Sequence, residues 1–322
     1  MASRSQGDHL RQAWDSDYHA PALVAPVVEL LGHLPLVLDG TLGGGGHSAA
    51  LLDAGVARVI GIDRDPDALA AASARLADAS RAGRFVAYRG NYAALDEIAV
   101  LAGLQFNGIL LDLGISSHQI DDSARGFSFR EGAPLDMRMD GDGATRSAAD
   151  LLNEEPELEL KRILRDYGDE PRAGRLAREI VRRRATRPFV TSDDLVGAIR
   201  GALGPRTGAS DFARLFQAVR IAVNDELAGL ERALPALRDR LAPGGMFAVM
   251  AYHSGEDRLV KHAFRAWSEA CVCPPRQPMC TCGGDHALGS VVTRRAIVAP
   301  HEETAHNPRA RSARLRAWRR AE

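Results

Sequence analysis

The stretch that decides the fold is LDGTLGGGGHS, residues 38–48, a glycine-rich loop at the end of a short apolar run. Glycines let the backbone adopt positive φ and pass close to a ligand. The helix predicted from about Ser48 adds free N–H groups and a partial positive charge, which favour an anionic group. Because dehydrogenases use a similar loop, the glycines alone do not identify the ligand.

Two carboxylates beside this loop narrow the choice of ligand. Asp39 stands directly before the glycines, where it can meet the ammonium of an amino-acid ligand but would repel a pyrophosphate. Asp63 ends the next apolar run, RVIGID, where it can accept both hydroxyls of a ribose. No Gly-Lys-Ser/Thr follows the loop, which argues against a phosphate-binding P-loop. A tight turn with two solvated aspartates is the alternative.

Apolar runs and helical patterns alternate around the loop. The strands predicted in this first half are residues 36–39, 58–63, 85–88 and 108–113. A helical pattern at 66–79 separates two of them, and such alternation indicates right-handed βαβ units with a parallel sheet. The strands are continuously apolar, as expected when both faces of the sheet are covered.

The pattern changes in the middle of the chain. Residues 125–145 are glycine-rich and predicted as a loop, and residues 151–203 are helical and charged. The alternation then resumes, with a helix to Leu241, a turn at 243–245 and a strand at 246–252.

We therefore predict an α/β fold with one discontinuous domain. Residues 1–118 and 220–322 form the sheet, and residues 119–219 form an inserted helical domain that recognises the substrate.

The composition is that of a soluble globular enzyme. The 322 residues are 45% hydrophobic and 26% charged, and the formal net charge of −1 means that any surface for a polyanion must be local. The opening MASRSQGDHLRQAW lacks the apolar core of a signal peptide. No apolar run approaches the roughly 20 residues that cross a bilayer. These features predict a cytoplasmic protein with no membrane partner.

Two segments are rich in basic residues. Residues 161–187 contain ten Lys/Arg against four Asp/Glu, and residues 309–320 contain six arginines and no acid. Such clusters suit contacts with nucleic-acid phosphates. A solvated helix face and a disordered basic tail are the alternatives.

All four cysteines lie in one short stretch, which suggests a metal site. Two Cys-x-Cys pairs among prolines and glycines can supply four thiolates to a structural zinc ion, although the usual spacing is Cys-x₂-Cys. A loop of reduced cysteines without metal is the alternative. The candidate zinc ligands are Cys271, Cys273, Cys280 and Cys282.

Nine motifs occur in one order along the chain: DGTLGGGGHS, GIDRDP, GNYAAL, LLDLGISSHQID, GFSF, PLDMRMD, FQAVRIAVNDEL, YHSGEDRLVK and NPRARSARLR. Together they resemble the family of ribosomal RNA small subunit methyltransferase H, the bacterial 16S rRNA cytosine-N4 methyltransferases, from about His19 to Arg316. Two departures are Ser210-Asp211-Phe212, where the family has His-Pro-Ala, and Gly255, where it has leucine.

The resemblance implies a fold, a reaction and a partner. The fold is a Rossmann-like class I S-adenosylmethionine methyltransferase sheet. The reaction is N4-methylation of a cytidine in the decoding region of 16S rRNA, and the partner is that RNA or the small ribosomal subunit.

The expected cofactor site combines both lines of reasoning. The residues themselves point to Tyr92, whose ring can stack on an adenine or simply pack, and to Asp112 at the end of the fourth strand. The resemblance alone adds His47 and Gln119. The full set expected to bind S-adenosylmethionine is Asp39, Gly43, Gly44, Gly45, Gly46, His47, Asp63, Tyr92, Asp112 and Gln119.

The implied chemistry indicates candidates for catalysis. The cytosine amine is a poor nucleophile, so the enzyme must align it with the sulfonium methyl and accept a proton. Asp112 is the best candidate to accept a hydrogen bond from the amine, and His253 approaches from a neighbouring strand end. A base must leave its stack to react, so we expect RNA in a cleft between sheet and insertion. The remaining candidates, in the loop after Asp112, are Ser116, Ser117 and His118.

Two other functions stay open from the sequence. A NAD-dependent oxidoreductase is disfavoured by Asp39 and by the lack of a spaced G-x-G-x-x-G. A non-enzymatic RNA-binding assembly factor is disfavoured by the intact loop and its carboxylates. The oligomeric state is also open, a homodimer included.

Overall fold

The computed structural model describes residues 20–141, 145–274 and 277–322. The opening segment, where the sequence predicts no signal peptide, lies outside the described residues, as do His19 and residues 142–144 of the expected loop. The chain forms two compact units, one comprising the residues up to Gly114 together with Gly229–Glu322, the other Ile115–Ala228. Within the described ranges, no helix has the length and apolar character to cross a membrane.

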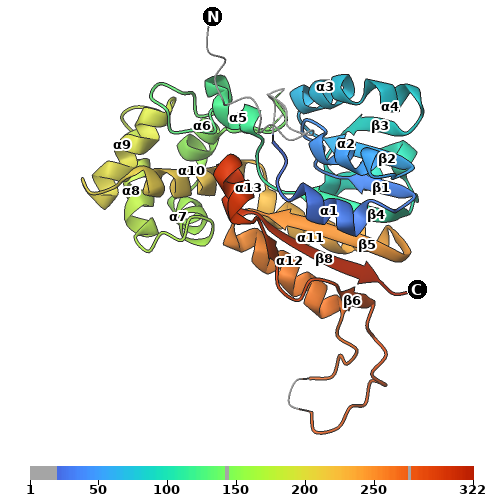
Figure 1. The fold of residues 1–322 in the computed structure, drawn as a ribbon. Helices are drawn as coiled ribbons and strands as arrows, with labels where there is room; N and C mark the ends of the chain where they lie inside the picture. Colours follow the sequence, from blue (N-terminus) through green and yellow to red (C-terminus); the bar gives the residue numbers. More distant parts are fainter. Residues whose placement is uncertain (1–19, 142–144, 275–276) are drawn as a thin grey trace, which may run out of the picture. The chain divides into compact units, whose positions relative to one another are not determined.

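The first unit is built on one sheet, in the order β3-β2-β1-β4-β5-β8-β6 (Figure 1). The first five strands pair in parallel, and β8 is antiparallel to both β5 and β6. A short strand, β7, also pairs with β8. The strands are β1 (Leu36–Asp39), β2 (Arg58–Asp63), β3 (Phe85–Arg89), β4 (Phe106–Asp112), β5 (Leu241–Ala251), β6 (Gly289–Val291), β7 (Ile297–Val298) and β8 (Arg314–Arg320).

This strand order confirms the predicted α/β fold with a mostly parallel sheet. A dinucleotide-binding Rossmann sheet has the order 3-2-1-4-5-6, whereas here the reversed strand β8 lies between β5 and β6. The order also reverses at β1, which lies between β2 and β4. Open α/β sheets bind ligands at the carboxyl ends of the strands beside such a switch point.

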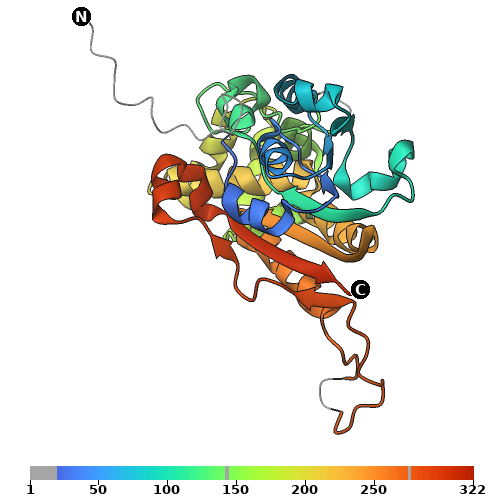
Figure 2. The ribbon, with the colours of Figure 1, turned by 45° about the vertical axis from the view of Figure 1, so that its right-hand side comes forward.

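Helices cover both faces of this sheet (Figures 1 and 2). On one face α1, α2 and α3 bury Leu31, Leu51 and Ala72 in a common cluster. On the other face α11 and α12 bury Leu234 and Phe264 in a second cluster. The helices of this region are α1 (Val24–Leu31), α2 (Gly46–Asp53), α3 (Pro66–Arg75), α4 (Ala77–Arg81), α11 (Glu226–Asp239), α12 (Ser254–Trp267) and α13 (His301–His306).

Three elements differ from the sequence expectation. The helix predicted at 66–79 is two helices, because the backbone of Leu76 has φ −102° and ψ 21°, outside the helical range. The helix predicted to reach Leu241 ends at Asp239. The expected turn at 243–245 falls within β5, at the point where its register with β4 shifts.

The second unit is helical and has a core of its own. Leu176, Leu195 and Phe216 are buried in one cluster with other residues of this unit. An isolated bridge joins Pro134 and Thr191. The helices are α5 (Ser117–Asp121), α6 (Ala148–Glu154), α7 (Glu157–Asp166), α8 (Ala173–Arg184), α9 (Ser192–Leu203) and α10 (Ala209–Val223).

Candidate active site

The glycine loop between β1 and α2 is open on one side. Gly43 has φ 50° and Gly45, which caps α2, has φ 74°, both in the left-handed region that favours glycine. A Cβ added to Gly43 would meet no atom within 4 Å. The backbone is therefore open at Gly43, whereas Gly44, Gly45 and Gly46 are buried. A Cβ on Gly45 would lie 3.2 Å from Ala72 Cβ, and one on Gly46 would lie 2.9 Å from Pro21 Cγ. The predicted contacts of these glycines with the cofactor stay predictions.

Asp39 lies beneath this loop and is only 1% exposed. Its Oδ2 accepts a hydrogen bond from the Ser48 hydroxyl at 2.7 Å, and its Oδ1 accepts one from the Thr41 N–H at 3.4 Å. Burial raises the pKa of Asp39, and the Ser48 hydrogen bond opposes that shift. These contacts order the loop, while the predicted contact with an ammonium group stays a prediction.

Asp63 connects the end of β2 to the same loop. Its Oδ2 accepts the Gly43 N–H at 2.8 Å and its Oδ1 accepts the Asp65 N–H at 2.9 Å. Burial raises the pKa of Asp63 to about 6, although both backbone hydrogen bonds act to lower it. Each carboxylate oxygen can accept a second hydrogen bond. The geometry therefore fits the predicted contact with ribose hydroxyls.

Asp112 ends β4 and joins three parts of the first unit. Its N–H donates to Thr41 Oγ1 at 2.6 Å, which ties the strand end to the glycine loop. Its Oδ1 accepts the Tyr252 hydroxyl at 2.9 Å, and its Oδ2 lies 3.5 Å from His47 Nδ1. Burial, followed by the charge of Asp112, raises the pKa of Tyr252 well above its usual value. Tyr252 is therefore a neutral donor that holds the carboxylate in one orientation.

Tyr252 is the residue of this cluster that the sequence prediction missed. Asp112 pairs with Met250 of β5 in the parallel register. Side chains alternate along a strand, so Tyr252, two residues after Met250, belongs to the same face. A prediction of how the strands 108–113 and 246–252 pair with each other would have identified Tyr252 as a neighbour of Asp112.

Tyr92 and His253 have different surroundings. Tyr92 opens the 3₁₀ helix η1 (Tyr92–Glu97), and a Cβ added to Gly40 would lie 3.2 Å from its Cβ, so it packs beside the start of the loop. His253 caps α12: its Nδ1 accepts the Glu256 N–H at 3.5 Å, and its Nε2 lies 3.2 Å from Glu256 Oε1. His253 therefore has a structural contact in addition to its predicted catalytic role.

Four further predicted site residues belong to the second unit. Ser116 caps α5, with its Oγ accepting the Gln119 N–H at 3.2 Å, and Gln119 Oε1 accepts the Ser116 N–H at 3.0 Å. These reciprocal bonds form a capping box. Ser117 and His118 follow in the first turn of α5. The predicted contacts of these four residues with cofactor and substrate stay predictions.

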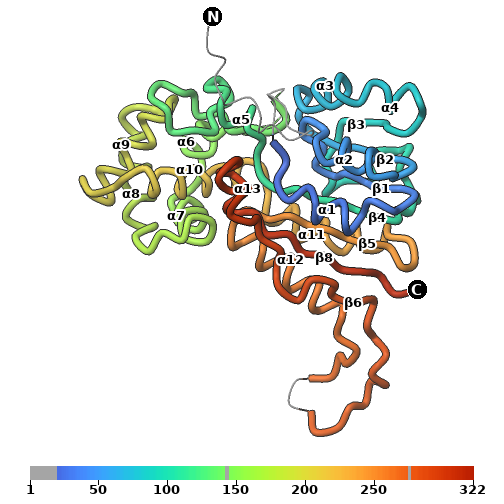
Figure 3. Tube along the Cα trace, in the orientation of Figure 1, coloured from blue at the N-terminus to red at the C-terminus, as the bar shows by residue number. Residues whose placement is uncertain are grey.

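The chain makes a long excursion between α12 and β6 (Figure 3). The four cysteines lie in this excursion, with their Sγ atoms close together. The Sγ–Sγ distances are 3.6 Å for Cys271–Cys280, 3.5 Å for Cys280–Cys282 and 3.7 Å for Cys271–Cys282. Cys273 completes the group, in which all four Sγ atoms lie within 4.8 Å of one another. Hydrogen bonds from the Val272 and Gly284 N–H groups lower the pKa of Cys282 to about 6. All four thiols are free rather than paired in disulfides.

The chain is similar to known proteins over nearly its whole length. A relative from Gemmatimonas aurantiaca, named ribosomal RNA small subunit methyltransferase H, is 63% identical over 304 residues, covering 94% of this chain and 96% of the relative. A protein of the same name from Heliobacterium modesticaldum is 48% identical over 309 residues, covering 93% of this chain and 97% of the relative. The model of the MraW methylase family matches residues 16–321. Nearly the whole chain is matched, and it belongs to the MraW methylase family.

Proposed function

We propose that this chain transfers a methyl group from S-adenosylmethionine to N4 of a cytidine in the decoding region of 16S rRNA. The observation that carries the proposal is the Asp112–Tyr252 hydrogen bond of 2.9 Å, at the end of the strand next to the glycine loop. The names of the relatives support a ribosomal RNA substrate. We propose that the protein acts in the cytoplasm, where such a substrate is found.

The glycine loop and Asp63 would hold the cofactor. S-adenosylmethionine supplies an electrophilic methyl group when bound. The open backbone at Gly43 would pass along it, and the carboxylate of Asp63 would accept the ribose hydroxyls. Tyr92, beside the start of the loop, would contact the adenine.

Asp112 would orient the nucleophile and accept its proton. The side chain of Asp112 is 10% exposed, and its Oδ1 already accepts the Tyr252 hydroxyl. A carboxylate oxygen has a second lone pair, which can accept a hydrogen bond from the cytosine amine. Fixing the amine in line with the methyl group lowers the barrier chiefly through positioning. Tyr252 contributes by preventing the carboxylate from rotating.

Transfer of labelled methyl groups tests this function. Small ribosomal subunits from a strain that lacks the related enzyme are incubated with the protein and labelled S-adenosylmethionine, and the modified nucleoside is identified. We expect N4-methylcytidine with the wild type and a large loss of transfer with Asp112→Ala. Cofactor binding without transfer to subunits or free rRNA would contradict the proposal.

We further propose that the four cysteines bind a structural zinc ion. A tetrahedral ion with Zn–S bonds of about 2.3 Å requires sulfur–sulfur separations of roughly 3.8 Å. The three Sγ–Sγ distances of 3.5, 3.6 and 3.7 Å are close to that value. Four thiolates leave no position for a substrate, so the ion would stabilise the excursion rather than take part in methyl transfer.

Metal analysis tests the zinc proposal. We expect about one zinc per chain in the wild type, and a thiolate-to-cobalt absorption band after exchange with Co²⁺. Cys271→Ser/Cys280→Ser should lose both signals and retain binding of S-adenosylhomocysteine. Metal-free wild-type protein that also fails to take up Zn²⁺ or Co²⁺ after reduction would contradict the proposal.

A further inference from the structure

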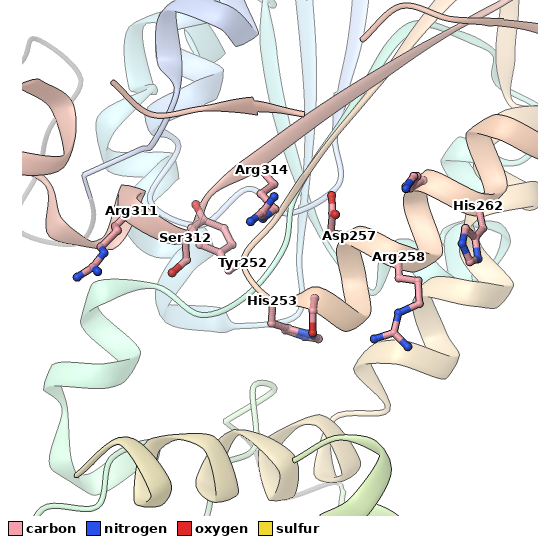
Figure 4. Close-up of a pocket in the computed structure, with 10 residues that line it drawn as sticks. Tyr252, His253, Asp257, Arg258, His262, Arg311, Ser312 and Arg314 are labelled. Atoms are coloured by element: carbon pink, nitrogen blue, oxygen red, sulfur yellow. The ribbon is translucent and has the colours of Figure 1, made fainter. Parts of the chain in front are cut away.

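A pocket of about 560 Å³ opens in the first unit, next to the end of β5 (Figure 4). One wall is a face of α12, where Ser254, Arg258 and Lys261 follow each other at intervals of three and four residues. The opposite wall comes from η4 (Pro308–Ser312) and the first residue of β8, Arg314. The pocket thus joins two segments that are far apart in the sequence.

The pocket carries an uncompensated positive charge. Arg258, Lys261, Arg311 and Arg314 line it and are exposed. Among the residues that the structure describes, no carboxylate lies within 4.0 Å of any of these four side-chain cations. The lining acid is Asp257, whose two oxygens accept hydrogen bonds from Arg316 at 2.7 and 3.1 Å. In a chain of net charge −1, this is a local concentration of cations that suits a polyanion.

The basic helix of the second unit offers a contrast. Arg182 and Arg183 both donate to Glu179, each at 2.7 Å. Arg184 donates to the Leu152 and Glu155 carbonyls, each at 2.8 Å. These three arginines, which the sequence marks as a candidate phosphate-binding cluster, already have partners within their own unit. The pocket cations are therefore the better candidates for phosphate contacts.

The pocket also adjoins the proposed catalytic carboxylate. Tyr252 lines the pocket, and its hydroxyl donates to Asp112 Oδ1 at 2.9 Å. A phosphate bound among the cations would therefore place its nucleotide strand beside the Tyr252–Asp112 pair.

We propose that this pocket binds the phosphate backbone of the RNA substrate, next to the nucleotide that is methylated; the inference rests on the proposed function. The pocket supplies affinity and position, and the identity of the base is recognised elsewhere. Each phosphate contact with single-stranded RNA contributes about 0.7 to the slope of log affinity against log salt concentration.

The test compares two full-length variants, one with three cations removed inside the pocket and one with a single arginine removed outside it. Arg258→Gln/Lys261→Gln/Arg314→Gln removes three pocket cations. Arg265→Gln removes an exposed arginine from the same helix, α12, outside the pocket lining. Binding of a labelled, protein-free 16S rRNA fragment is measured over a salt series. Binding of S-adenosylhomocysteine and methyl transfer to small subunits are measured for each variant.

We expect the triple variant to bind the RNA fragment at least tenfold more weakly, with a salt slope lower by about 2. Its affinity for S-adenosylhomocysteine should equal that of the wild type, and Arg265→Gln should resemble the wild type throughout. Methyl transfer by the triple variant should show a raised KM for RNA with a smaller change in kcat.

Two results would overturn the inference in different ways. If the wild type methylates the subunit and the triple variant binds the RNA fragment as Arg265→Gln does, the pocket is not the phosphate site, even if transfer to assembled subunits falls. If the wild type binds S-adenosylhomocysteine but neither binds nor methylates ribosomal RNA, the proposed function fails and the pocket inference fails with it.

Discussion

Among single residues, Asp63 is the group whose titration reports on the proposed cofactor site. Burial raises its pKa to about 6, so the carboxyl is protonated below that pH and can no longer accept both ribose hydroxyls. The stability of the free protein depends on pH in the opposite direction from cofactor binding. Folding favours the protonated form of Asp63, so the contribution of this group to the free energy of unfolding is lost as the pH rises through about 6. Cofactor binding, in contrast, should strengthen over the same pH range.

We predict that the affinity for S-adenosylhomocysteine falls about tenfold for each pH unit below 6. Isothermal titration calorimetry between about pH 5 and about pH 7.5 measures this directly, since the ligand itself does not titrate there. Asp63→Asn, which has no ionisable group, should bind weakly with a flat pH profile. Equal affinity of the wild type at both ends of the range would refute the ribose role.

Tyr252 acts through Asp112 and is therefore a positioning residue. Tyr252→Phe removes a hydrogen bond to a charged acceptor, an interaction that contributes about 1.5–3 kcal/mol. We expect kcat for methyl transfer to fall at least tenfold, while affinity for S-adenosylhomocysteine stays unchanged. Single-turnover transfer to small subunits measures the effect on the chemical step. A normal rate would show that the orientation of Asp112 does not depend on this hydroxyl.

At the scale of elements, the sequence predicts buried parallel strands well and reversed or ion-paired strands poorly. Strands β1, β2 and β4 are continuous apolar runs covered on both faces, so composition alone identifies them. β8 is hidden because arginines occupy most of it, so that RLRAWRR looks like a basic tail. Arg316 is neutralised by Asp257, 59 residues earlier in the chain, and no local pattern contains that partner.

The candidate site also contains residues that the local sequence predicts and one residue that it does not. The glycine loop and Asp63 are adjacent in sequence to the strands that place them, and the sequence predicts them without a structure. Tyr252 reaches Asp112 across 140 residues through the pairing of β4 with β5. Its place in the site depends on strand register, which the separate strand predictions do not contain.

The aromatic layer under β8 gives a prediction about stability. Trp318 is fully buried, packs edge-on against Trp267 with ring centroids 5.3 Å apart, and donates from Nε1 to Ser268 Oγ at 3.0 Å. Replacing a buried tryptophan by alanine leaves a cavity that costs about 3–5 kcal/mol. Trp318→Ala should therefore lower the free energy of unfolding by that amount in urea denaturation.

The matched control for Trp318→Ala is Val298→Ala. Val298 lies on β7, which also pairs with β8, but it is 56% exposed. Its substitution should change the free energy of unfolding by less than about 0.5 kcal/mol. Similar losses for the two variants would mean that the aromatic layer does not hold α12 on the sheet.

At the scale of the whole molecule, the chain has separate hydrophobic cores. The cluster that contains Leu195 and Phe216 draws all its residues from the second unit, and the two clusters on the sheet draw theirs from the first. Arg220 and Glu226, which form an ion pair at 2.8 Å, also both belong to the second unit. Cooperative folding depends on burying one contiguous apolar cluster, so each unit has what independent folding requires.

We therefore predict that a fragment of residues 115–228 folds alone. Its circular dichroism should be helical and should melt in one cooperative transition. Leu195→Asp is the control, because it places a charge at a position that is 0% exposed and should abolish the transition. A wild-type fragment that melts without cooperativity, as the control does, would mean that the second unit folds only when the sheet is present. In that case a hydrophobic core built entirely from residues of the second unit would not be sufficient for that unit to fold.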